Sequence, residues 1–350
     1  MSSGDVSIAG RSIGPGHPPY LVAELSGNHN GELNRALALM DAAKEAGASA
    51  IKLQSYTADT LTIDHDGPGF KVDGGAWDGY TLYDLYTEAG TPWEWHPTLF
   101  SKGRELGVTV FSTPFDETAV DMLEELDAPA YKIASFEIVD LPLIAKAAAT
   151  NKPLVISTGM ANLEEIQEAV ATARQHGDGG LVILHCVSSY PAPPEQINLC
   201  TLGDLAKSLD AVVGLSDHTL GTAVSVAAVA LGASMIEKHF TLRRSEGGVD
   251  SHFSLEPEEF AELVSASNTA WAALGSATYD RQPSEVETSM YRRSLYAVAN
   301  IEAGDTFTRE NIRSIRPGLG LSPKYLPKVL GKKARENIVR GTPLSWDAVD

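Results

Sequence analysis

Two histidines, His218 and His239, stand where neighbouring apolar segments end, so they could share one metal ion. His218 follows segment 211–216, and His239 ends segment 234–239. Two imidazole ligands leave positions for water and substrate, which is typical of a catalytic site. Such a site favours Mn2+, with Mg2+ or Co2+ as further candidates, over structural zinc. The alternative is that each histidine makes ordinary hydrogen bonds at a strand end, and the spacing does not decide between the two.

Two lysines, Lys52 and Lys132, lie in separate apolar segments. A buried ammonium group without an anionic partner would have a strongly lowered pKa, so we expect an anion between them. One small molecule with a phosphate and a carboxylate would satisfy both, as charge-assisted hydrogen bonds are strong. The hydroxyl groups that could add hydrogen bonds are those of Thr113, Ser135, Ser157 and Ser216. Two alternatives stay open: a structural network with Glu24 and Glu237, or a Schiff-base lysine, as in some barrel aldolases.

A carboxylate, Glu24, ends the first long apolar segment, within the stretch AELSGNHNG. A carboxylate at such a position can orient a sugar hydroxyl or accept its proton. The alternative interpretation of this stretch is a turn followed by a helix cap.

Short apolar segments alternate with amphipathic stretches from Tyr20 to about Gly275, the pattern of βα units with parallel strands. Eight repeats favour an α/β fold of the (β/α)8 TIM-barrel type, whose active sites lie at the C-terminal ends of the strands. Alternation along a strand places Lys52 with Gln54, and Glu237 with His239, on the inner face. The predicted strands span residues 20–24, 50–54, 108–113, 130–134, 153–157, 181–187, 211–216 and 234–239.

The segments outside the repeats divide the chain further. The spacing of Leu and Ala predicts a helix over 33–46 that ends at Gly47. A long loop over 56–81, rich in Gly and Asp and containing Trp77, is either a lid or specificity element or a floppy surface loop. We expect a barrel domain over 1–275, a linker over 276–290 and a small β-rich domain over 291–350, which is close to the lower size limit for independent folding.

Charge and composition exclude several classes of partner. The formal net charge of -19 disfavours nucleic acid and anionic membranes, and no segment is long and apolar enough to cross a bilayer. Cys186 and Cys200 are too few for a disulfide framework, and we expect both to be packing residues. The start of the chain lacks a secretory pattern, so we expect a cytoplasmic protein.

Several motifs occur in a fixed order along nearly the whole chain, and together they resemble the sialic acid synthase family. Each motif alone is weak, but the ordered set is specific. The tail stretch SIRPGLGLSPKYLPKVLGKKA resembles the family's antifreeze-like (SAF) domain. The motifs are AELSGNHNG, IKLQSYTADTLT, FSTPFD, YKIAS, ISTGM, LHCVSSYP, GLSDHTLG, EKHFTL and GGVDSHFSLEPEEF.

The resemblance implies roles for individual residues. His218 and His239 would hold the metal. Arg316 would reach into the barrel of a partner subunit in a domain-swapped homodimer. Ser188 stands where the family commonly carries Asn, which is a departure at a phosphoenolpyruvate contact. The implied phosphoenolpyruvate ligands are Lys52, Thr113, Lys132, Ser135, Ser157, Ser188 and Ser216, and the implied sugar ligands are Glu24, Gln54, Tyr190, Asp250 and Arg316.

The implied reaction joins phosphoenolpyruvate to an open-chain amino-hexose and releases phosphate. The stretches ELSGNHNG, EKHFTL and RSEGGVDSHFSLEPEEF favour 2,4-diacetamido-2,4,6-trideoxy-L-altrose as the acceptor, with another amino-hexose as the alternative. A metal-free aldolase using pyruvate through a lysine remains a second hypothesis, and a sugar- or ice-binding module a third. Ice binding is disfavoured because the tail is studded with Arg and Lys.

Overall fold

The computed structural model describes residues 4–350, which form two compact units that divide after Gly275. The first unit ends at Gly275, and the second spans Ser276–Asp350. Each unit has its own buried apolar cluster. Among the described residues, no helix has both the length and the apolar character needed to cross a membrane.

The first unit is a closed barrel of eight parallel strands, in the order β10-β3-β4-β5-β6-β7-β8-β9. The predicted barrel is therefore confirmed, and each predicted strand end lies within one residue of the observed end. Apolar runs bounded by turn residues are buried on both faces here, as parallel strands require. The strands are β3 (Tyr20–Glu24), β4 (Ala50–Ser55), β5 (Thr109–Pro114), β6 (Tyr131–Ile133), β7 (Leu154–Ser157), β8 (Leu181–Cys186), β9 (Val212–Asp217) and β10 (Met235–His239).

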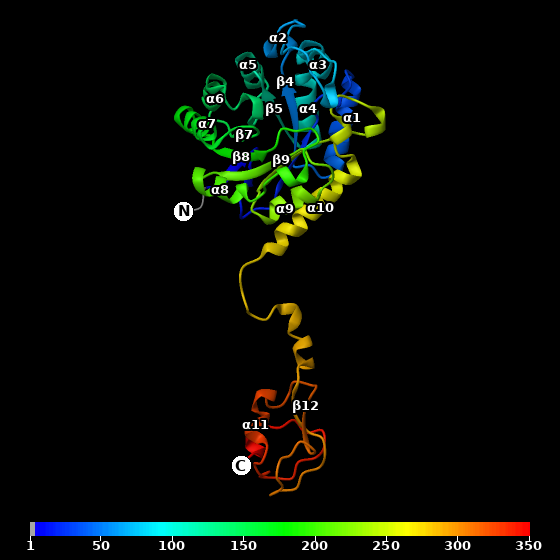
Figure 1. Ribbon diagram of the computed structural model, residues 1–350, viewed down its shortest axis with the longest axis vertical. Coiled ribbons are helices and arrows are strands. Elements are labelled where there is room, and N and C mark those ends of the chain that lie inside the picture. The colour runs from blue at the N-terminus through cyan, green and yellow to red at the C-terminus, as the bar shows by residue number, and fades with distance from the viewer. Residues whose placement is uncertain (1–3) are drawn as a thin grey trace. The chain divides into compact units, whose positions relative to one another are not determined.

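Amphipathic helices surround the strands (Figure 1). The first helix follows the predicted bounds closely, because Ala46 caps it and Gly47 then takes a left-handed conformation with φ of 91°. The short α2 and α3 come from the long segment between β4 and β5. The helices are α1 (Leu33–Glu45), α2 (Ala58–Leu61), α3 (Leu82–Ala89), α4 (His96–Leu106), α5 (Glu117–Glu125), α6 (Leu141–Ala148), α7 (Leu163–His176), α8 (Thr201–Leu209), α9 (Ala223–Ala230) and α10 (Pro257–Leu274).

Apolar side chains fill both the space outside the strands and the lower part of the barrel. Ile51, Leu53 and Ile236 belong to the core between strands and helices, as their alternation with Lys52, Gln54 and Glu237 predicts. A hairpin of β1 (Val6–Ile8) and β2 (Arg11–Ile13), which the sequence analysis did not predict, closes the N-terminal end. Its apolar residues pack against those at the starts of the strands, including Tyr20 and Met235.

The second unit is a small β-rich domain. Strands β11 (Ser294–Ala297) and β12 (Ile312–Ile315) pair antiparallel, and α11 (Leu326–Val329) follows. Its core holds apolar side chains such as Leu295, Phe307 and Val329, all of them almost fully buried. The predicted linker over 276–290 contains the 3-10 turns Pro283–Glu285 and Thr288–Tyr291, and its residues are mostly exposed.

Candidate active site

Four charged side chains meet at the C-terminal ends of the strands and form what we term the charge network: Glu24, Lys52, Lys132 and Glu237. Lys52 Nζ lies 2.8 Å from Glu24 Oε2 and 3.5 Å from Glu237 Oε1. Lys132 Nζ lies 3.3 Å from the same Glu237 oxygen. Each of the four is at most 4 % exposed. The two ammonium groups therefore face a common point inside the barrel.

Burial and mutual attraction oppose each other in this network. Burial works to lower the pKa of Lys52, but Glu237 and Glu24 outweigh it and raise the pKa. Burial lowers the pKa of Lys132, which shares Glu237 with Lys52. Burial raises the pKa of Glu24, and its attraction to Lys52 only partly offsets this. Burial would raise the pKa of Glu237 too, but Lys132 and Lys52 hold it below its usual value.

Hydroxyl and amide groups surround the charge network without satisfying it. Lys52 Nζ donates to Thr113 Oγ1 at 3.1 Å, and Gln54 Nε2 donates to Glu24 Oε1 at 2.8 Å. Ser216 Oγ lies 3.5 Å from Glu237 Oε1. Glu237 Oε2 and Ser157 Oγ are buried with no hydrogen-bond partner among residues 4–350. Such unsatisfied groups are costly unless a ligand or water meets them, so the network is suited to receive a polar molecule.

The loops after β6, β7 and β8 bring two further hydroxyls together around a glycine. Gly159 N donates to Ser135 Oγ at 3.1 Å. A side chain at position 159 would collide with the hydroxyls of Ser135 and Ser188. Because glycine has no Cβ, the hydroxyls of Ser135 and Ser188 can both lie close to position 159. They therefore lie close to each other and to the Gly159 amide.

The two predicted metal ligands lie side by side. The ring centroids of His218 and His239 are 5.4 Å apart, and both side chains are buried. His218 Nδ1 donates to the Val187 carbonyl at 3.1 Å, which leaves Nε2 free to act as a ligand. His239 Nδ1 is buried and has no hydrogen-bond partner among the described residues. Burial and the neighbouring positive charges hold the pKa of His239 well below its usual value, which favours the neutral imidazole that binds metals.

These two imidazoles fit a divalent ion that takes its remaining ligands from water and substrate. Among the described residues, no group of three or more His, Cys, Asp or Glu side chains is arranged to hold a metal. Two buried nitrogen donors would leave positions open for water and substrate, which a catalytic ion needs and a closed structural zinc site does not have.

Aromatic rings line one side of the histidine pair. Tyr190 lies 4.3 Å from His218 and 5.3 Å from Phe253, measured between ring centroids. Asp250 lies nearby, since its Oδ2 is 3.8 Å from His239 Nδ1 and accepts a hydrogen bond from Ser26. The predicted sugar ligands Tyr190 and Asp250 thus meet at the histidine pair, and Glu24 and Gln54 meet at the charge network.

A second buried ion pair, Lys238 with Asp217, links β9 and β10 next to the histidines in sequence. The two groups are 2.9 Å apart and almost completely buried. Asp217 also accepts from Ser225 Oγ at 2.5 Å and from the Thr219 amide at 2.8 Å, and Lys238 donates to the Thr219 carbonyl. We term these two residues the strand clamp. Alternation directs them to the face opposite Glu237 and His239.

Two residues near these groups, Glu137 and Cys186, were not predicted to belong to the site. Glu137, just after β6, has a buried Oε2 with no partner among residues 4–350, and burial raises its pKa to about 7. Its position two residues after Ser135 is the signal that could have found it. Cys186 is buried as predicted, and its Sγ lies 3.8 Å from both His218 Nδ1 and Ser188 Oγ. The packing prediction was wrong for Cys200, which is exposed.

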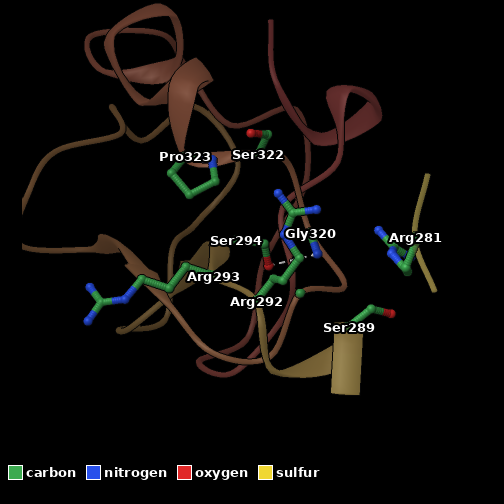
Figure 2. Close-up of a pocket in the computed structure, with 9 residues that line it drawn as sticks. Arg281, Ser289, Arg292, Arg293, Ser294, Gly320, Ser322 and Pro323 are labelled. Carbon is green, nitrogen blue, oxygen red and sulfur yellow. Dashed lines mark hydrogen bonds between the residues drawn. The ribbon is translucent and has the colours of Figure 1, made fainter. Parts of the chain in front are cut away.

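Arg316 belongs to the second unit, where it is exposed at the end of β12. That unit also holds a hollow of about 510 Å3, lined by Arg281, Arg292 and Arg293 together with serines and glycines (Figure 2). The three arginines are exposed, and Ser294 at its floor already bonds to the Gly320 amide at 2.9 Å. The role of Arg316 as a sugar ligand stays a prediction.

Comparison with known proteins identifies the family of each unit. Residues 39–279 match the NeuB family, and residues 292–350 match the SAF domain. The chain belongs to the NeuB family. Its SAF match covers the small β-rich unit, so the predicted fold of barrel plus SAF domain is confirmed in both parts.

Relatives within the NeuB family cover nearly the whole chain. Pseudaminic acid synthase from Helicobacter pylori is 43% identical over 334 residues, covering 95% of this chain and 98% of the relative. N,N'-diacetyllegionaminic acid synthase from Legionella pneumophila is 36% identical, covering 95% and 94%. The crystal structure of N-acetylneuraminic acid (sialic acid) synthetase from Leptospira borgpetersenii, in complex with citrate, is 32% identical and superposes with a TM-score of 0.74, covering 83% of this chain and 96% of that one.

Proposed function

We propose that the protein condenses phosphoenolpyruvate with 2,4-diacetamido-2,4,6-trideoxy-L-altrose and water to give pseudaminic acid and phosphate. The observation that carries this proposal is the unsatisfied charge network beside a buried pair of histidines. The similarity to pseudaminic acid synthases, which exceeds that to the legionaminic acid synthase, supports the choice of acceptor.

The reaction balances without any further reactant. A carbon-carbon bond forms between C3 of phosphoenolpyruvate and the aldehyde carbon of the open-chain sugar, and the aldehyde oxygen gains a proton. Water adds at C2, and the bond from C2 to the phosphate oxygen breaks. Phosphate leaves, and C2 becomes the ketone of the product.

The charge network would bind the anionic groups of phosphoenolpyruvate. Lys52 and Lys132 supply the positive charge for phosphate and carboxylate, and the buried Ser157 hydroxyl supplies a hydrogen bond that has no other partner among residues 4–350. The remaining proposed contacts are the hydroxyls of Thr113, Ser135, Ser188 and Ser216.

Two carboxyl groups are suited to hold protons during the reaction. Glu24, fixed by Lys52 and Gln54, would orient a hydroxyl of the acceptor at its Oε atoms. Glu137, whose pKa is raised by burial to about 7, lies close enough to Lys132 and Lys52 to be influenced by their charges and would be a second proton-exchanging group beside the phosphoenolpyruvate site.

His218 and His239 would hold the metal, with Mn2+ as our first choice and Mg2+ or Co2+ as alternatives. When bound, the ion would supply Lewis acid chemistry to the aldehyde oxygen or to the attacking water. The histidines contribute a buried pair of nitrogen donors, of which His218 is oriented by the Val187 carbonyl.

We also propose that the protein works as a domain-swapped homodimer in the cytoplasm, in which Arg316 contacts the sugar in the partner's barrel. Charge supports this pairing: residues 276–350 carry 12 Lys and Arg against 9 Asp and Glu, whereas residues 1–275 carry 15 against 37. Attraction between a cationic tail and an anionic barrel favours their association. Mixing Arg316→Ala with a variant whose barrel is inactive should restore some active sites, and no restoration would contradict the swap.

Product analysis tests the proposed reaction. Phosphate release is measured with phosphoenolpyruvate and a panel of amino-hexoses, with and without Mn2+, and the products are identified by NMR. We expect release only when both substrates are present, with the altrose-configured acceptor preferred. Turnover of mannose-configured sugars alone would reject the acceptor, and a borohydride-trapped pyruvate adduct with activity in EDTA would favour a lysine aldolase instead.

A further inference from the structure

The long segment after β4 is folded onto itself and forms a structured tongue, which we define as residues 70–82. Lys71 and Thr81 form an antiparallel bridge. The Val72 amide donates to the Tyr80 carbonyl at 2.9 Å, and the Gly79 amide donates back to the Val72 carbonyl at 3.0 Å. The segment is therefore ordered, which excludes the floppy surface loop and leaves the lid or specificity element.

Trp77 in the tongue reaches two loops of the barrel mouth. Its Nε1 donates to the Val249 carbonyl at 2.8 Å, in the loop after β10. Its ring centroid lies 5.4 Å from that of Tyr190, in the loop after β8. Tyr190 in turn lies against His218. The tongue therefore contacts the active site through one aromatic ring and one hydrogen bond.

The hydrogen bond from Trp77 acts on a segment that carries a proposed sugar ligand. Val249 precedes Asp250, whose carboxylate accepts from Ser26 and faces His239. On its other side Val249 packs against Gly27, where any side chain would collide with Val249 Cγ2. The segment is thus held between Gly27 and Trp77, which restricts where the Asp250 carboxylate can lie.

The rings of Trp77, Tyr190 and Phe253 follow one another across the mouth, with centroid distances of 5.4 Å and 5.3 Å. We term them the aromatic wall. Trp77 and Tyr190 are partly exposed, whereas Phe253 is almost fully buried, so an acceptor that enters from the mouth would meet the first two rings of this wall. A methyl group makes no hydrogen bonds to water, so it loses none when it packs against an aromatic surface. A hydroxymethyl group in the same place gives up its hydrogen bonds to water.

We infer that Trp77 is a specificity and positioning residue that selects an amino-hexose with a methyl group at C6 over one with a hydroxymethyl group. This inference rests on the proposed condensation with an amino-hexose. Trp77 acts in two ways: its ring extends the apolar wall against which the C6 methyl packs, and its indole N–H fixes the backbone that carries Asp250.

Two substitutions separate these two contributions. Trp77→Phe keeps an aromatic ring but removes the N–H, so we expect the KM for the acceptor to rise about three- to tenfold, the effect of one lost hydrogen bond. Trp77→Ala removes both. For this variant we expect the preference for a 6-deoxy acceptor over its 6-hydroxy counterpart of the same configuration to fall from about 10–100-fold to within about threefold. The KM for phosphoenolpyruvate should stay within about twofold of wild type in both.

Trp271→Phe is the matched control. The indole of Trp271, on α10, also donates to a backbone carbonyl, that of Pro15 at 3.4 Å, beside the hairpin that closes the opposite end of the barrel. This substitution removes the same kind of hydrogen bond far from the mouth. We expect the KM for the acceptor and the acceptor preference to match wild type. Thermal unfolding of all three variants shows whether a change in KM reflects lost stability.

The possible outcomes distinguish this inference from the proposed function. If the wild type converts the 6-deoxy acceptor but Trp77→Ala leaves both its KM and its preference unchanged, the inference is wrong and the function stands. An equal rise of the KM values for acceptor and phosphoenolpyruvate in Trp77→Ala would also overturn it, because a general structural role predicts that result. If the wild type converts no amino-hexose at all, the proposed function itself fails.

Discussion

Two buried charged clusters lie on opposite faces of the barrel sheet and share only strand β10, and they differ in how fully their groups are bonded. In the strand clamp, Lys238 and Asp217 pair with each other and with Ser225 and the Thr219 backbone. In the charge network, two lysines share one Glu237 oxygen, while the other oxygen has no partner among residues 4–350. Buried polar groups are normally satisfied, so a complete cluster indicates structure and an incomplete one indicates a ligand site.

Both clusters lose hydration free energy on burial, but they compensate for this loss in different ways. Burying an ion pair requires the loss of hydration, which is recovered only when geometry and further hydrogen bonds are good. The strand clamp recovers it within the chain. The charge network, we propose, recovers it when phosphoenolpyruvate binds.

The largest expected effect comes from breaking the histidine pair beside the charge network. His239→Ala should reduce turnover by at least about a thousandfold, because a metal ion stabilises developing charge by several kcal/mol. Mn2+ binding, measured by electron paramagnetic resonance, should be lost together with activity, while the circular dichroism spectrum stays that of the wild type. Normal Mn2+ affinity in this variant would contradict the ligand role.

Breaking the strand clamp should affect stability instead of substrate binding. Lys238→Met leaves Asp217 as a buried, unpaired charge, which should lower the free energy of unfolding by about 3–5 kcal/mol. Denaturant unfolding measures this change. At a temperature where the variant is folded, its affinity for phosphoenolpyruvate should equal that of wild type. A variant that is fully stable but binds phosphoenolpyruvate poorly would reverse the roles we assign to the two clusters.

Glu137 offers a smaller effect that depends on pH. Its pKa of about 7 lies above the usual 4.5, so the folded protein holds this proton where the unfolded chain has released it. Stability therefore falls as the pH rises from about 4.5 to 7, by about 3 kcal/mol in total. Glu137→Gln should be more stable than wild type at pH 8 by about this amount, and the gain should vanish below pH 4.5.

Urea unfolding across this pH range tests the prediction, with Glu168→Gln as a control. Glu168 is an exposed carboxyl on α7, so its substitution makes the same chemical change without burial. A constant difference between Glu137→Gln and wild type at all pH values would show that Glu137 is not held protonated by burial.

Strand order and site position followed from the sequence, but the pairing of charges did not. Alternation of Lys52 with Ile51 and Leu53 was enough to place the lysine inside the barrel. The sharing of Glu237 by two lysines depends on strand register across the closed barrel, which no local pattern reports. The hairpin β1–β2 was missed because its two three-residue strands carry too little periodicity.

The contacts of Trp77 could not be predicted from the sequence, for a different reason. Its hydrogen bond to Val249 joins residues 172 positions apart, through a loop whose fold rests on backbone pairing and glycine conformations. By contrast, the proximity of His218 and His239 followed directly from their places at the ends of adjacent parallel strands.

Calorimetric titration of phosphoenolpyruvate into wild type and into Lys132→Met tests most directly whether the incomplete network is an anion site. One strong hydrogen-bonded charge contact contributes about 1.5–3 kcal/mol, so we predict binding about 10–100-fold weaker in Lys132→Met. Because Lys52 still pairs with Glu237, unfolding should change less than in Lys238→Met. Lys152→Met, which removes a partly exposed lysine paired with Glu124, serves as the control and should bind as wild type does. Equal affinity of wild type and Lys132→Met would contradict the account.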